Sequence, residues 1–567
     1  MPKKALERSW RSGILSGRAS SSRLALLVGV ILGLAACKVP PDSREVPADS
    51  AESAPTIVAA GETLQGELVA NDPPVAVFKG IPFAASPVGE LRWRPPAPVS
   101  PRVGVQSATE FGPACIQDPD HVPDWYRFIA ETFGEDPALV PKLESTSEDC
   151  LHLNIWTANL GGDEPWPVMV WIHGGSNSSG SPAELPYDGA NLTLKGVVYV
   201  SFNYRLNAFG FLAHPALTAE SEHGSSGNYG LLDQIAALRW IQRHIAFFGG
   251  DPSRVTIFGE SAGATDVVYL MSSPLASGLF HRAILQSGGY AVSEFRTLAE
   301  VEEIGIGLAE ILGVSDSEDV AGALRSKDAD EVLRAALESY PGWDSVPGVD
   351  GWVLEDAPGR VFDRGDQAPV PVLIGYNTDE WTTLGHYSPD ATLDSFSQAL
   401  GEVYGDLASR AQELYPAMTD DEAAAASEDW LTDVNFACPS RFIADKVGRA
   451  SGNVFFYVFS RSGPTPGGKE LGAFHGAETP YAMDSLAREP YIPREPYDQE
   501  LADIMSDYWV QFAATGDPNA TGQPPWPRYD PENREYLELG DPIEIRTGIR
   551  TEPCDLWEVL QTSRLNR

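Results

Sequence analysis

Residues 254–263 read Arg254-Val255-Thr256-Ile257-Phe258-Gly259-Glu260-Ser261-Ala262-Gly263, and this stretch decides the fold. Its β-branched and aromatic residues predict a buried strand up to Phe258, and helix-forming sequence follows Gly263. A Gly-x-Ser-x-Gly between a strand and a helix is typical of a nucleophile elbow. We expect a side chain at either glycine to collide with the neighbouring strand or helix, and we expect Ser261 to have a strained backbone.

Short apolar strands alternate with helical stretches along the chain. The predicted strands cover 168–172, 197–203, 254–258, 283–286, 370–375 and 454–460, and the clearest helices cover 231–247 and 501–514. This alternation favours an α/β fold with a mostly parallel central sheet and helices on both faces. The strands are almost continuously hydrophobic, so both faces are expected to be buried. Longer acidic stretches at 292–369 and 381–452 are predicted to be large excursions around the rim.

Composition limits the classes of partner. The chain has 567 residues, of which 43% are hydrophobic, enough for a large core. Its formal net charge is −40. A surface with this much negative charge repels nucleic acid and anionic lipid headgroups. We therefore expect no nucleic-acid partner.

The N-terminus has the pattern of an export signal. Basic residues precede an apolar run at 24–36, which is too short for a comfortable transmembrane span. The run ends in Leu34-Ala35-Ala36-Cys37 and resembles a bacterial lipoprotein signal, in which Cys37 is lipidated and becomes the mature N-terminus. The alternative is an ordinary secretory signal with a chance cysteine. Residues 1–36 are therefore a predicted signal peptide and 37–56 a flexible tether.

These signals predict a protein that is exported to the bacterial envelope. It is expected to be lipid-anchored on the periplasmic or outer-membrane face, with the lipid as its only membrane contact, or secreted if Cys37 is not lipidated. The other cysteines are Cys115, Cys150, Cys438 and Cys554, and no C-x-x-C spacing suggests zinc. In an oxidising compartment two disulfides are the simplest interpretation, and the sequence by itself allows three pairings.

A serine nucleophile needs a base, and in α/β-hydrolases the acid and then the histidine follow the serine along the chain. Three histidines come after Ser261, namely His281, His386 and His475. His281 lies just beyond the helix after the elbow, and His386 follows the candidate acids by only a few residues. His475 lies beyond the predicted strand 454–460 and is the best placed.

The acid is expected past a strand that lies between the serine and the histidine. The predicted strand 371–375 is followed by Asn377-Thr378-Asp379-Glu380. A carboxylate here accepts the Nδ1–H bond of the histidine, fixes its tautomer and stabilises the imidazolium. The spacing by itself leaves Asp379 and Glu380 equally possible.

An oxyanion hole is expected in the loop after strand 168–172. There the sequence reads His173-Gly174-Gly175-Ser176, like the HGGG-type loop of lipases and esterases. Adjacent glycines let the backbone approach a ligand and turn its N–H groups inward. His173 is predicted to be structural rather than catalytic.

Taken together, these residues resemble the type-B carboxylesterases, the family that includes the cholinesterases. The resemblance covers roughly residues 57–560. It rests on ordered matches at 78–84 with Arg92, Pro95 and Pro96, at 147–154, 203–206, 228–234 and 248–252, and in the C-terminal part at Trp509, Phe512, Thr515-Gly516, Pro518-Asn519 and Trp526-Pro527. The resemblance implies one α/β-hydrolase domain over 57–567 that hydrolyses small-molecule carboxylic esters through an acyl-enzyme, and it implies no metal or organic cofactor.

The resemblance also assigns roles to individual residues. It makes Ser261 the nucleophile, Glu380 the acid as the last carboxylate of an Asn-x-Asp-Glu motif, and His475 the base in a His-Gly-x-Glu context that Glu478 completes. The implied oxyanion donors are the amides of Gly175, Ser176 and Ala262, and the implied disulfides are Cys115–Cys150 and Cys438–Cys554. Amidase, thioesterase and lactonase activities use the same triad, and a non-catalytic cell-surface binding protein on the same fold is the alternative from another class.

The chain departs from the family pattern in three places. Ser176 replaces the third glycine of the oxyanion loop, where a positive φ costs serine more than glycine. Trp381 replaces the glycine that usually follows the acid. The loop between Cys115 and Cys150 carries Trp125, Tyr126 and Phe128, but it lacks the tryptophan that cholinesterases use to hold quaternary ammonium, so choline-ester specificity is not expected. These aromatic residues are expected either to form a lid over the substrate or to anchor the insertion to the body.

Glu260, beside the nucleophile, is expected either to contribute to the electrostatics of the pocket or to be purely structural.

Overall fold

The computed structural model describes residues 54–69, 73–143, 145–293, 295–339, 347–385 and 391–565. The predicted signal peptide at 1–36, Cys37, the tether up to residue 53 and His386 lie outside these ranges.

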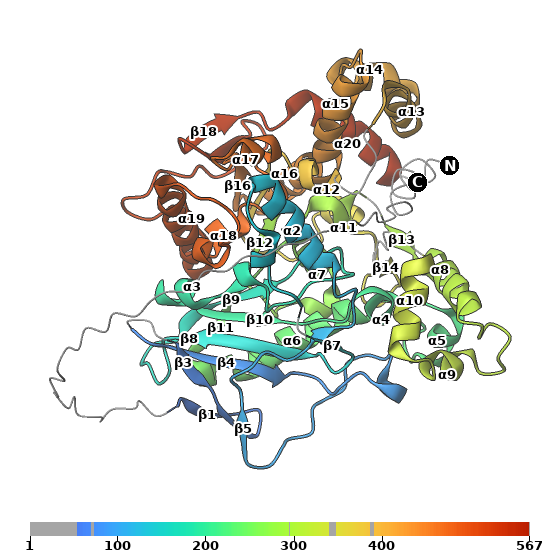
Figure 1. Cartoon of the computed structure of the whole chain (residues 1–567), viewed down its shortest axis with the longest axis vertical. Coiled ribbons are helices and arrows are strands. Elements are labelled where there is room, and N and C mark those ends of the chain that lie inside the picture. Colours follow the sequence, from blue (N-terminus) through green and yellow to red (C-terminus); the bar gives the residue numbers. More distant parts are fainter. Residues whose placement is uncertain are drawn as a thin grey trace, which may run out of the picture.

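An 11-stranded sheet forms the centre of the molecule, with the strand order β18-β17-β16-β15-β12-β11-β9-β10-β8-β4-β3 (Figure 1). Neighbouring strands are parallel from β10 to β17, and the pairs at the two ends of the sheet are antiparallel. The strands are β3 (Glu67–Val69), β4 (Val75–Pro82), β8 (His152–Thr157), β9 (Trp166–Ile172), β10 (Val198–Phe202), β11 (Gly250–Glu260), β12 (Arg282–Gln286), β15 (Val372–Asn377), β16 (Val454–Phe459), β17 (Glu535–Leu539) and β18 (Glu544–Thr547). This confirms the predicted α/β architecture.

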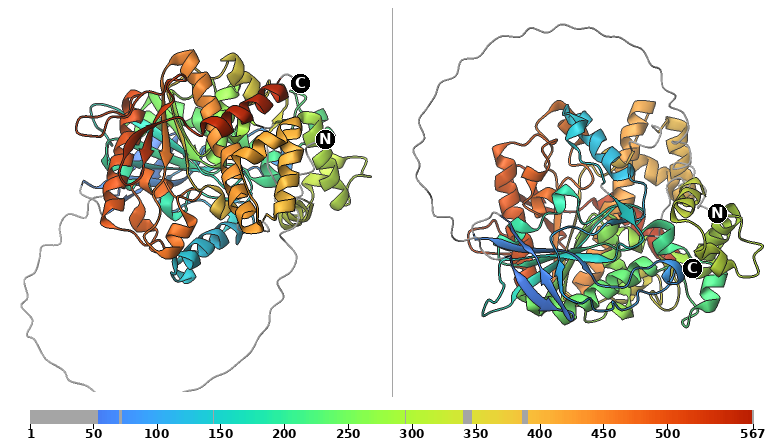
Figure 2. Two further views of the ribbon diagram at one scale, coloured as in Figure 1. Left: turned by 90° about the horizontal axis from the view of Figure 1, so that it is seen from above. Right: turned by 60° about the horizontal axis from the view of Figure 1, so that its bottom comes forward.

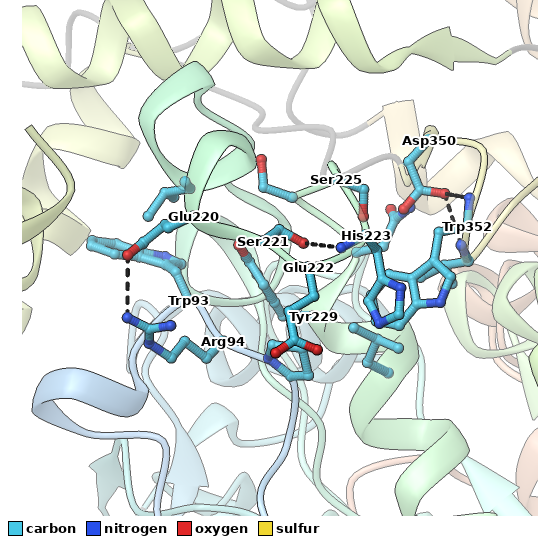
Figure 3. Close-up of a pocket in the computed structure, with 16 residues that line it drawn as sticks. Trp93, Arg94, Glu220, Ser221, Glu222, His223, Ser225, Tyr229, Asp350 and Trp352 are labelled. Carbon is cyan, nitrogen blue, oxygen red and sulfur yellow. Dashed lines mark hydrogen bonds and ion pairs between the residues drawn. The ribbon is translucent and has the colours of Figure 1, made fainter.

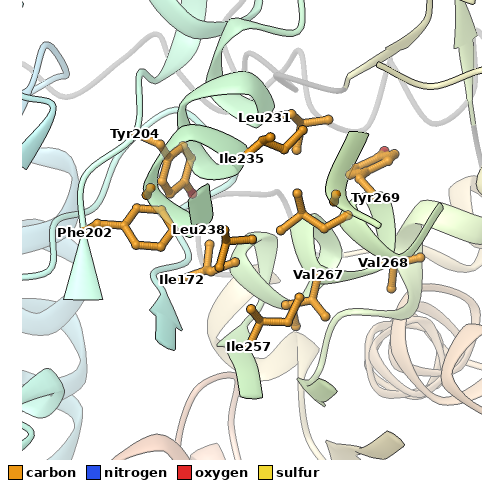
Figure 4. Packing of buried hydrophobic residues seen from close by; sticks show 14 of the residues in the cluster. Ile172, Phe202, Tyr204, Leu231, Ile235, Leu238, Ile257, Val267, Val268 and Tyr269 are labelled. Atoms are coloured by element: carbon orange, nitrogen blue, oxygen red, sulfur yellow. The ribbon is translucent and has the colours of Figure 1, made fainter. Parts of the chain in front are cut away.

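Both faces of the sheet are buried. Along β9, Val168, Val170 and Ile172 join one apolar cluster, whereas Met169 and Trp171 join the other. The first cluster includes α6 (Tyr229–His244), α7 (Ala262–Ser272) and α16 (Cys438–Ser451), and the second includes α3 (Ala190–Leu194) and α19 (Pro496–Thr515). Figure 4 shows part of the first cluster, where α6 and α7 pack against the sheet. Burial on both faces is the reason that these strands are hydrophobic at almost every position.

The two long excursions are helical. The first contains α8 (Leu298–Ile311), α9 (Val320–Arg325), α10 (Ala329–Ser339) and α11 (Pro358–Arg364), and the second contains α12 (Trp381–Leu384), α13 (Leu393–Tyr404), α14 (Ala408–Leu414) and α15 (Asp420–Thr432). The group α13–α15 packs together at the rim, beside the C-terminal helix α20 (Thr551–Leu565), in all views (Figures 1 and 2). It has a small core of its own that includes Phe396 and Trp430.

The N-terminal strands were not among those predicted from the pattern. Residues after Pro55 form β1 (Thr56–Ala59) and β2 (Glu62–Gln65), which pair with β5 (Val105–Ser107) in a separate small sheet. These strands are short and only partly buried, so they lack the continuous apolar run that reveals the central strands.

Two disulfides join distant segments, with the pairing that the family resemblance implies. Cys115–Cys150 closes a loop across 35 residues, and Cys438–Cys554 joins α16 to α20 across 116 residues. The first loop carries helix α2 (His121–Phe133). None of the helices in the described ranges has the length and apolar character needed to cross a membrane.

Candidate active site

Ser261 lies at a sharp turn between β11 and α7, at the carboxyl end of a central parallel strand. Its φ is +57° and its ψ is −126°, a combination that L residues rarely adopt. Its amide donates to the Gln286 carbonyl at 2.9 Å, and its carbonyl accepts from the Thr265 amide at 2.9 Å. The predicted strain is thus confirmed, and these two bonds hold the serine in that conformation.

Both flanking glycines are required by close packing. A Cβ at Gly259 would lie 2.6 Å from the Ile172 carbonyl oxygen and 2.6 Å from the Gly263 backbone carbon. A Cβ at Gly263 would lie 2.0 Å from the same Ile172 oxygen. The expected collision with the neighbouring strand and helix is confirmed, because β9 and α7 approach β11 too closely for a side chain.

His475 and Glu380 form a hydrogen-bonded pair although they are 95 residues apart. Nδ1 of His475 lies 2.5 Å from Oε2 of Glu380, and both side chains are buried. The other oxygen of Glu380 accepts from the Asn377 amide at 2.8 Å and from the Ser287 hydroxyl at 2.5 Å. Glu380 is therefore held in one orientation, and its bond fixes the proton of His475 on Nδ1 so that Nε2 is left as the basic nitrogen.

Asp379, the other candidate acid, faces away from the histidine ring. Its Oδ2 accepts from the Ala473 amide at 2.9 Å and from the Thr378 hydroxyl at 2.6 Å. The choice that the strand spacing left open is therefore decided by side-chain direction. Trp381 follows Glu380 as the first residue of α12, and its amide donates to the Thr432 hydroxyl at 3.3 Å.

Carboxyl groups surround the imidazole. Oε1 of Glu260 lies 3.2 Å from Nε2 of His475, and Glu260 is only 6% exposed. Burial raises the pKa of Glu260, and His475 opposes that shift. Burial lowers the pKa of His475, but the carboxylates of Glu260 and Glu380 outweigh it and raise that pKa above its ordinary value. Glu260 therefore favours the imidazolium form of His475.

Glu478, three residues after His475, is a buried carboxyl group that supports the site. Its oxygens accept from Asn377 Nδ2 at 2.5 Å and from Gln286 Nε2 at 3.1 Å. Gln286 in turn accepts from the Trp509 indole at 3.0 Å. Burial raises the pKa of the Glu478 carboxyl, with Glu380 adding to the shift. This buried network ties the ends of β12 and β15 to the segment that carries His475.

The expected oxyanion loop lies beside the nucleophile. A Cβ at Gly174 would be 3.1 Å from the Ser261 Cβ, and a Cβ at Gly175 would be 2.3 Å from the Ser179 carbonyl oxygen. Gly175 has φ +100°, and Ser176 keeps a left-handed φ of +55° despite its side chain. Ser176 thus makes this left-handed turn at a conformational cost of about 1–2 kcal/mol. Ala262 is the first residue of α7, so its N–H group has no acceptor within that helix.

His173 supports this loop. Its Nδ1 lies 2.9 Å from the Gly174 carbonyl, and its ring stacks on Tyr204 at 4.6 Å between centroids. The Tyr204 hydroxyl donates to the His173 carbonyl at 2.9 Å. Burial lowers the pKa of His173 to about 4, so the ring is neutral. These contacts support the predicted structural role of His173, and none of them involves His475.

Helix α2 covers the histidine and is also anchored to the body. The Trp125 ring meets the His475 ring edge-on, with centroids 6.4 Å apart. The Tyr126 hydroxyl donates to Glu184 Oε2 at 3.0 Å, and the Tyr126 ring lies 5.9 Å from that of Tyr491. The contacts of Tyr126 fit the anchoring interpretation of the aromatic loop, and Phe128 packs against the neighbouring apolar cluster. Trp125 lies against His475, so a lid over the substrate stays a prediction for that residue.

Other candidate positions lie away from this constellation. His281 directly precedes β12, at the amino end of that strand. Its Nδ1 accepts from the Val255 amide at 3.2 Å. Ser261 follows the opposite end of β11, about 17–20 Å further along the strand. A separate pocket of about 260 Å³ lies between Trp93, Tyr229 and Trp352 (Figure 3). Neither Ser261 nor His475 lines it.

This site can be compared with known proteins. The sequence profile of the Carboxylesterase family matches residues 53–557. The chain belongs to the carboxylesterase family. It is 37% identical over 505 residues to the fumonisin B1 esterase of Sphingopyxis macrogoltabida, covering 87% of this chain and 88% of the relative. It is 34% identical over 528 residues to carboxylesterase 1D of Mus musculus, covering 86% and 89%. It is 35% identical over 517 residues to human cocaine esterase, covering 85% and 87%.

This carboxylesterase is thus a serine hydrolase that cleaves carboxylic esters. Ser287 is a contact of the candidate acid Glu380 that the sequence reasoning missed. It directly follows β12, has φ +55° and donates to Glu380. Its place at the carboxyl end of a parallel strand was the available signal, because polar residues at that edge face the site.

Proposed function

We propose that Ser261, His475 and Glu380 are the catalytic triad of this esterase. The observations that carry the proposal are the buried 2.5 Å contact between His475 Nδ1 and Glu380 Oε2 and the 3.2 Å contact between His475 Nε2 and Glu260, which directly precedes the strained Ser261 of the nucleophile elbow. Nε2 of His475 takes the Ser261 proton while Oγ forms a bond to the ester carbonyl carbon. The imidazolium that results is stabilised by Glu380.

The tetrahedral intermediate is held by the amides of Gly175, Ser176 and Ala262. The loss of one such donor typically costs about 2.7–4 kcal/mol of transition-state stabilisation. When the intermediate collapses, the bond to the alcohol oxygen breaks and His475 gives its proton to that oxygen. A water then attacks the acyl-enzyme with the same base, which releases the acid and restores Ser261.

A panel of p-nitrophenyl esters of varied acyl length tests this assignment, with Ser261→Ala as the matched variant. We expect hydrolysis by the wild type, loss of activity in Ser261→Ala, and a phosphonate adduct on Ser261 by mass spectrometry. Activity that persists in Ser261→Ala would refute the assignment. Matched amides, thioesters and lactones separate the related activities. Fumonisin B1 belongs in the panel because the Sphingopyxis relative is named as its esterase.

We also propose that Cys37 is lipidated and that the enzyme is exported and anchored on the periplasmic or outer-membrane face of a bacterial envelope. The basic and apolar sequence before Cys37 supports this, as does the presence of two disulfides, which persist in oxidising compartments. Cys37→Ser is expected to move the protein from the membrane fraction to the soluble fraction. Retention in the membrane fraction would contradict the lipid anchor.

A further inference from the structure

Asp266 is a buried carboxyl group that the triad does not use. It lies on α7, five residues after Ser261, and is 0% exposed. Its helix packs among apolar side chains that include Ile235 and Ile257 (Figure 4). Both oxygens accept from neutral amides, Oδ1 from Asn177 Nδ2 at 3.0 Å and Oδ2 from Gln234 Nε2.

Such a group is costly to keep in a core. An ionised carboxylate that is moved from water into apolar surroundings loses its hydration, and two amides replace only part of it. Burial accordingly raises the pKa of the Asp266 carboxyl to about 7, while the bonds from Asn177 and Gln234 act in the opposite direction. An apolar residue at this position would avoid this desolvation cost. The carboxyl group of Asp266 is therefore expected to have a role that an apolar side chain could not fill.

Asn177 is part of the oxyanion loop. It directly follows Ser176, and both residues have φ +55°. A left-handed conformation persists in non-glycine residues only where the surroundings over-determine it. Asn177 is fixed at two points, because its carbonyl accepts from the Asn207 amide at 2.7 Å and its side chain donates to Asp266.

Asp266 connects this loop to the helix of the nucleophile. Ala262 and Asp266 are four residues apart on α7, about 6 Å along the helix axis. One rigid helix therefore carries both an oxyanion donor, the Ala262 amide, and the group that holds the loop with the other donors. The bond that Asn177 donates to Asp266 links the oxyanion loop to this helix.

We propose that Asp266 is a positioning residue of the oxyanion hole, which holds Asn177 and thereby keeps the amides of Gly175 and Ser176 in register with that of Ala262. This proposal rests on the oxyanion donors assigned under the proposed function. It gives Asp266 no contact with the substrate. Its effect is on the transition state, because the hole binds the oxyanion more tightly than the ground-state carbonyl.

The chain offers a matched control for this role. Gln234, on α6, donates to the same carboxyl group as Asn177 but belongs to no part of the oxyanion loop. Asp266→Leu removes both amide contacts, whereas Gln234→Leu leaves the bond to Asn177 in place. Asp266→Asn keeps one acceptor and almost the same shape, and it is the conservative variant that is expected to fold if Asp266→Leu does not.

The measurements are kcat and KM for p-nitrophenyl butyrate and Ki for a trifluoromethyl ketone of matched chain length, which binds a serine esterase as a tetrahedral adduct. We expect Asp266→Leu to lower kcat by about 10-fold to 100-fold with KM within about 3-fold, since small misplacements of catalytic groups cost about this much. Ki is expected to rise by the same factor as kcat falls. Asp266→Asn is expected to show a smaller change of the same kind.

Gln234→Leu is expected to lower the melting temperature but to leave kcat and Ki within about 3-fold of the wild type. Equal losses of kcat in Asp266→Leu and Gln234→Leu would overturn the proposal, as would a loss that appears only in KM. If only Asp266→Asn folds, unchanged kcat and Ki in that variant overturn it. The triad assignment is tested separately. It fails if Ser261→Ala keeps its activity, whatever the Asp266 variants show.

Discussion

Replacing Glu260 by glutamine is expected to move the acidic limb of the pH profile of kcat/KM to lower pH. Oε1 of Glu260 lies 3.2 Å from Nε2 of His475, the nitrogen that must accept the serine proton. Two unit charges at this separation attract by about 1.3 kcal/mol in bulk water and about 5 kcal/mol at an effective dielectric constant near 20. At about 1.36 kcal/mol per pKa unit, the lower value already corresponds to about one unit.

The direction follows from the form of His475 that is active. The neighbouring carboxylates raise the pKa of His475, and only the neutral imidazole is a base. The wild-type kcat/KM therefore rises as the pH rises through that pKa. Without the charge of Glu260 the pKa falls, so the same rise should occur at least about one pH unit lower. The plateau at high pH is expected to be lower in the variant, because the imidazolium of the transition state loses a stabilising charge.

The assay is kcat/KM for p-nitrophenyl butyrate from about pH 5 to about pH 11, because the pKa of His475 is raised to about 9, and it is followed at the isosbestic wavelength of nitrophenol. The matched control is Asp379→Asn, which removes a carboxylate next to Glu380 whose oxygen accepts from the Ala473 amide and not from His475. We expect its limb to coincide with that of the wild type. A limb that does not move in Glu260→Gln, or that moves to higher pH, would refute the reasoning.

Three further predictions concern the surroundings of the site. Trp125→Ala removes the ring that lies 6.4 Å from His475, so we expect altered selectivity across a series of acyl lengths, measured as kcat/KM, and an unchanged series would show that Trp125 only anchors α2. Replacing Cys438 and Cys554 by serine opens a link across 116 residues and is expected to cost about 4–5 kcal/mol in a chain-entropy estimate, checked by denaturant unfolding. Burial raises the pKa of Glu184 to about 7, so the folded state keeps its proton where the unfolded chain has lost it, and stability falls as the pH rises from about 4.5 to about 7. Glu184→Gln should therefore raise the melting temperature at pH 8 relative to pH 5 by about 1–3 °C compared with the wild type, and an identical pH dependence of melting in both would count against this.

The sequence by itself determined the local parts of the fold. The strand, turn and helix around Ser261 follow from a buried β-branched run, two glycines and a helical pattern, all within about 20 residues of chain. The parallel strands β9 to β12, β15 and β16 were predictable because burial on both faces makes them continuously apolar, whereas β4, β8 and β17 of the same sheet were not among the predicted strands. The short strands β1 and β2 were not, since they bury too little surface to leave such a pattern.

Only the tertiary structure decided which side chains meet. From the residues alone Asp379 and Glu380 were equivalent, and the family resemblance favoured Glu380. In the fold Asp379 turns toward the Ala473 amide and Glu380 toward His475, 95 residues further along the chain. Asp266 likewise became visible only through its partner Asn177. The physical reason is that side-chain direction at a strand end or on a helix depends on packing against segments that are distant in the sequence, and local pattern contains no record of those contacts.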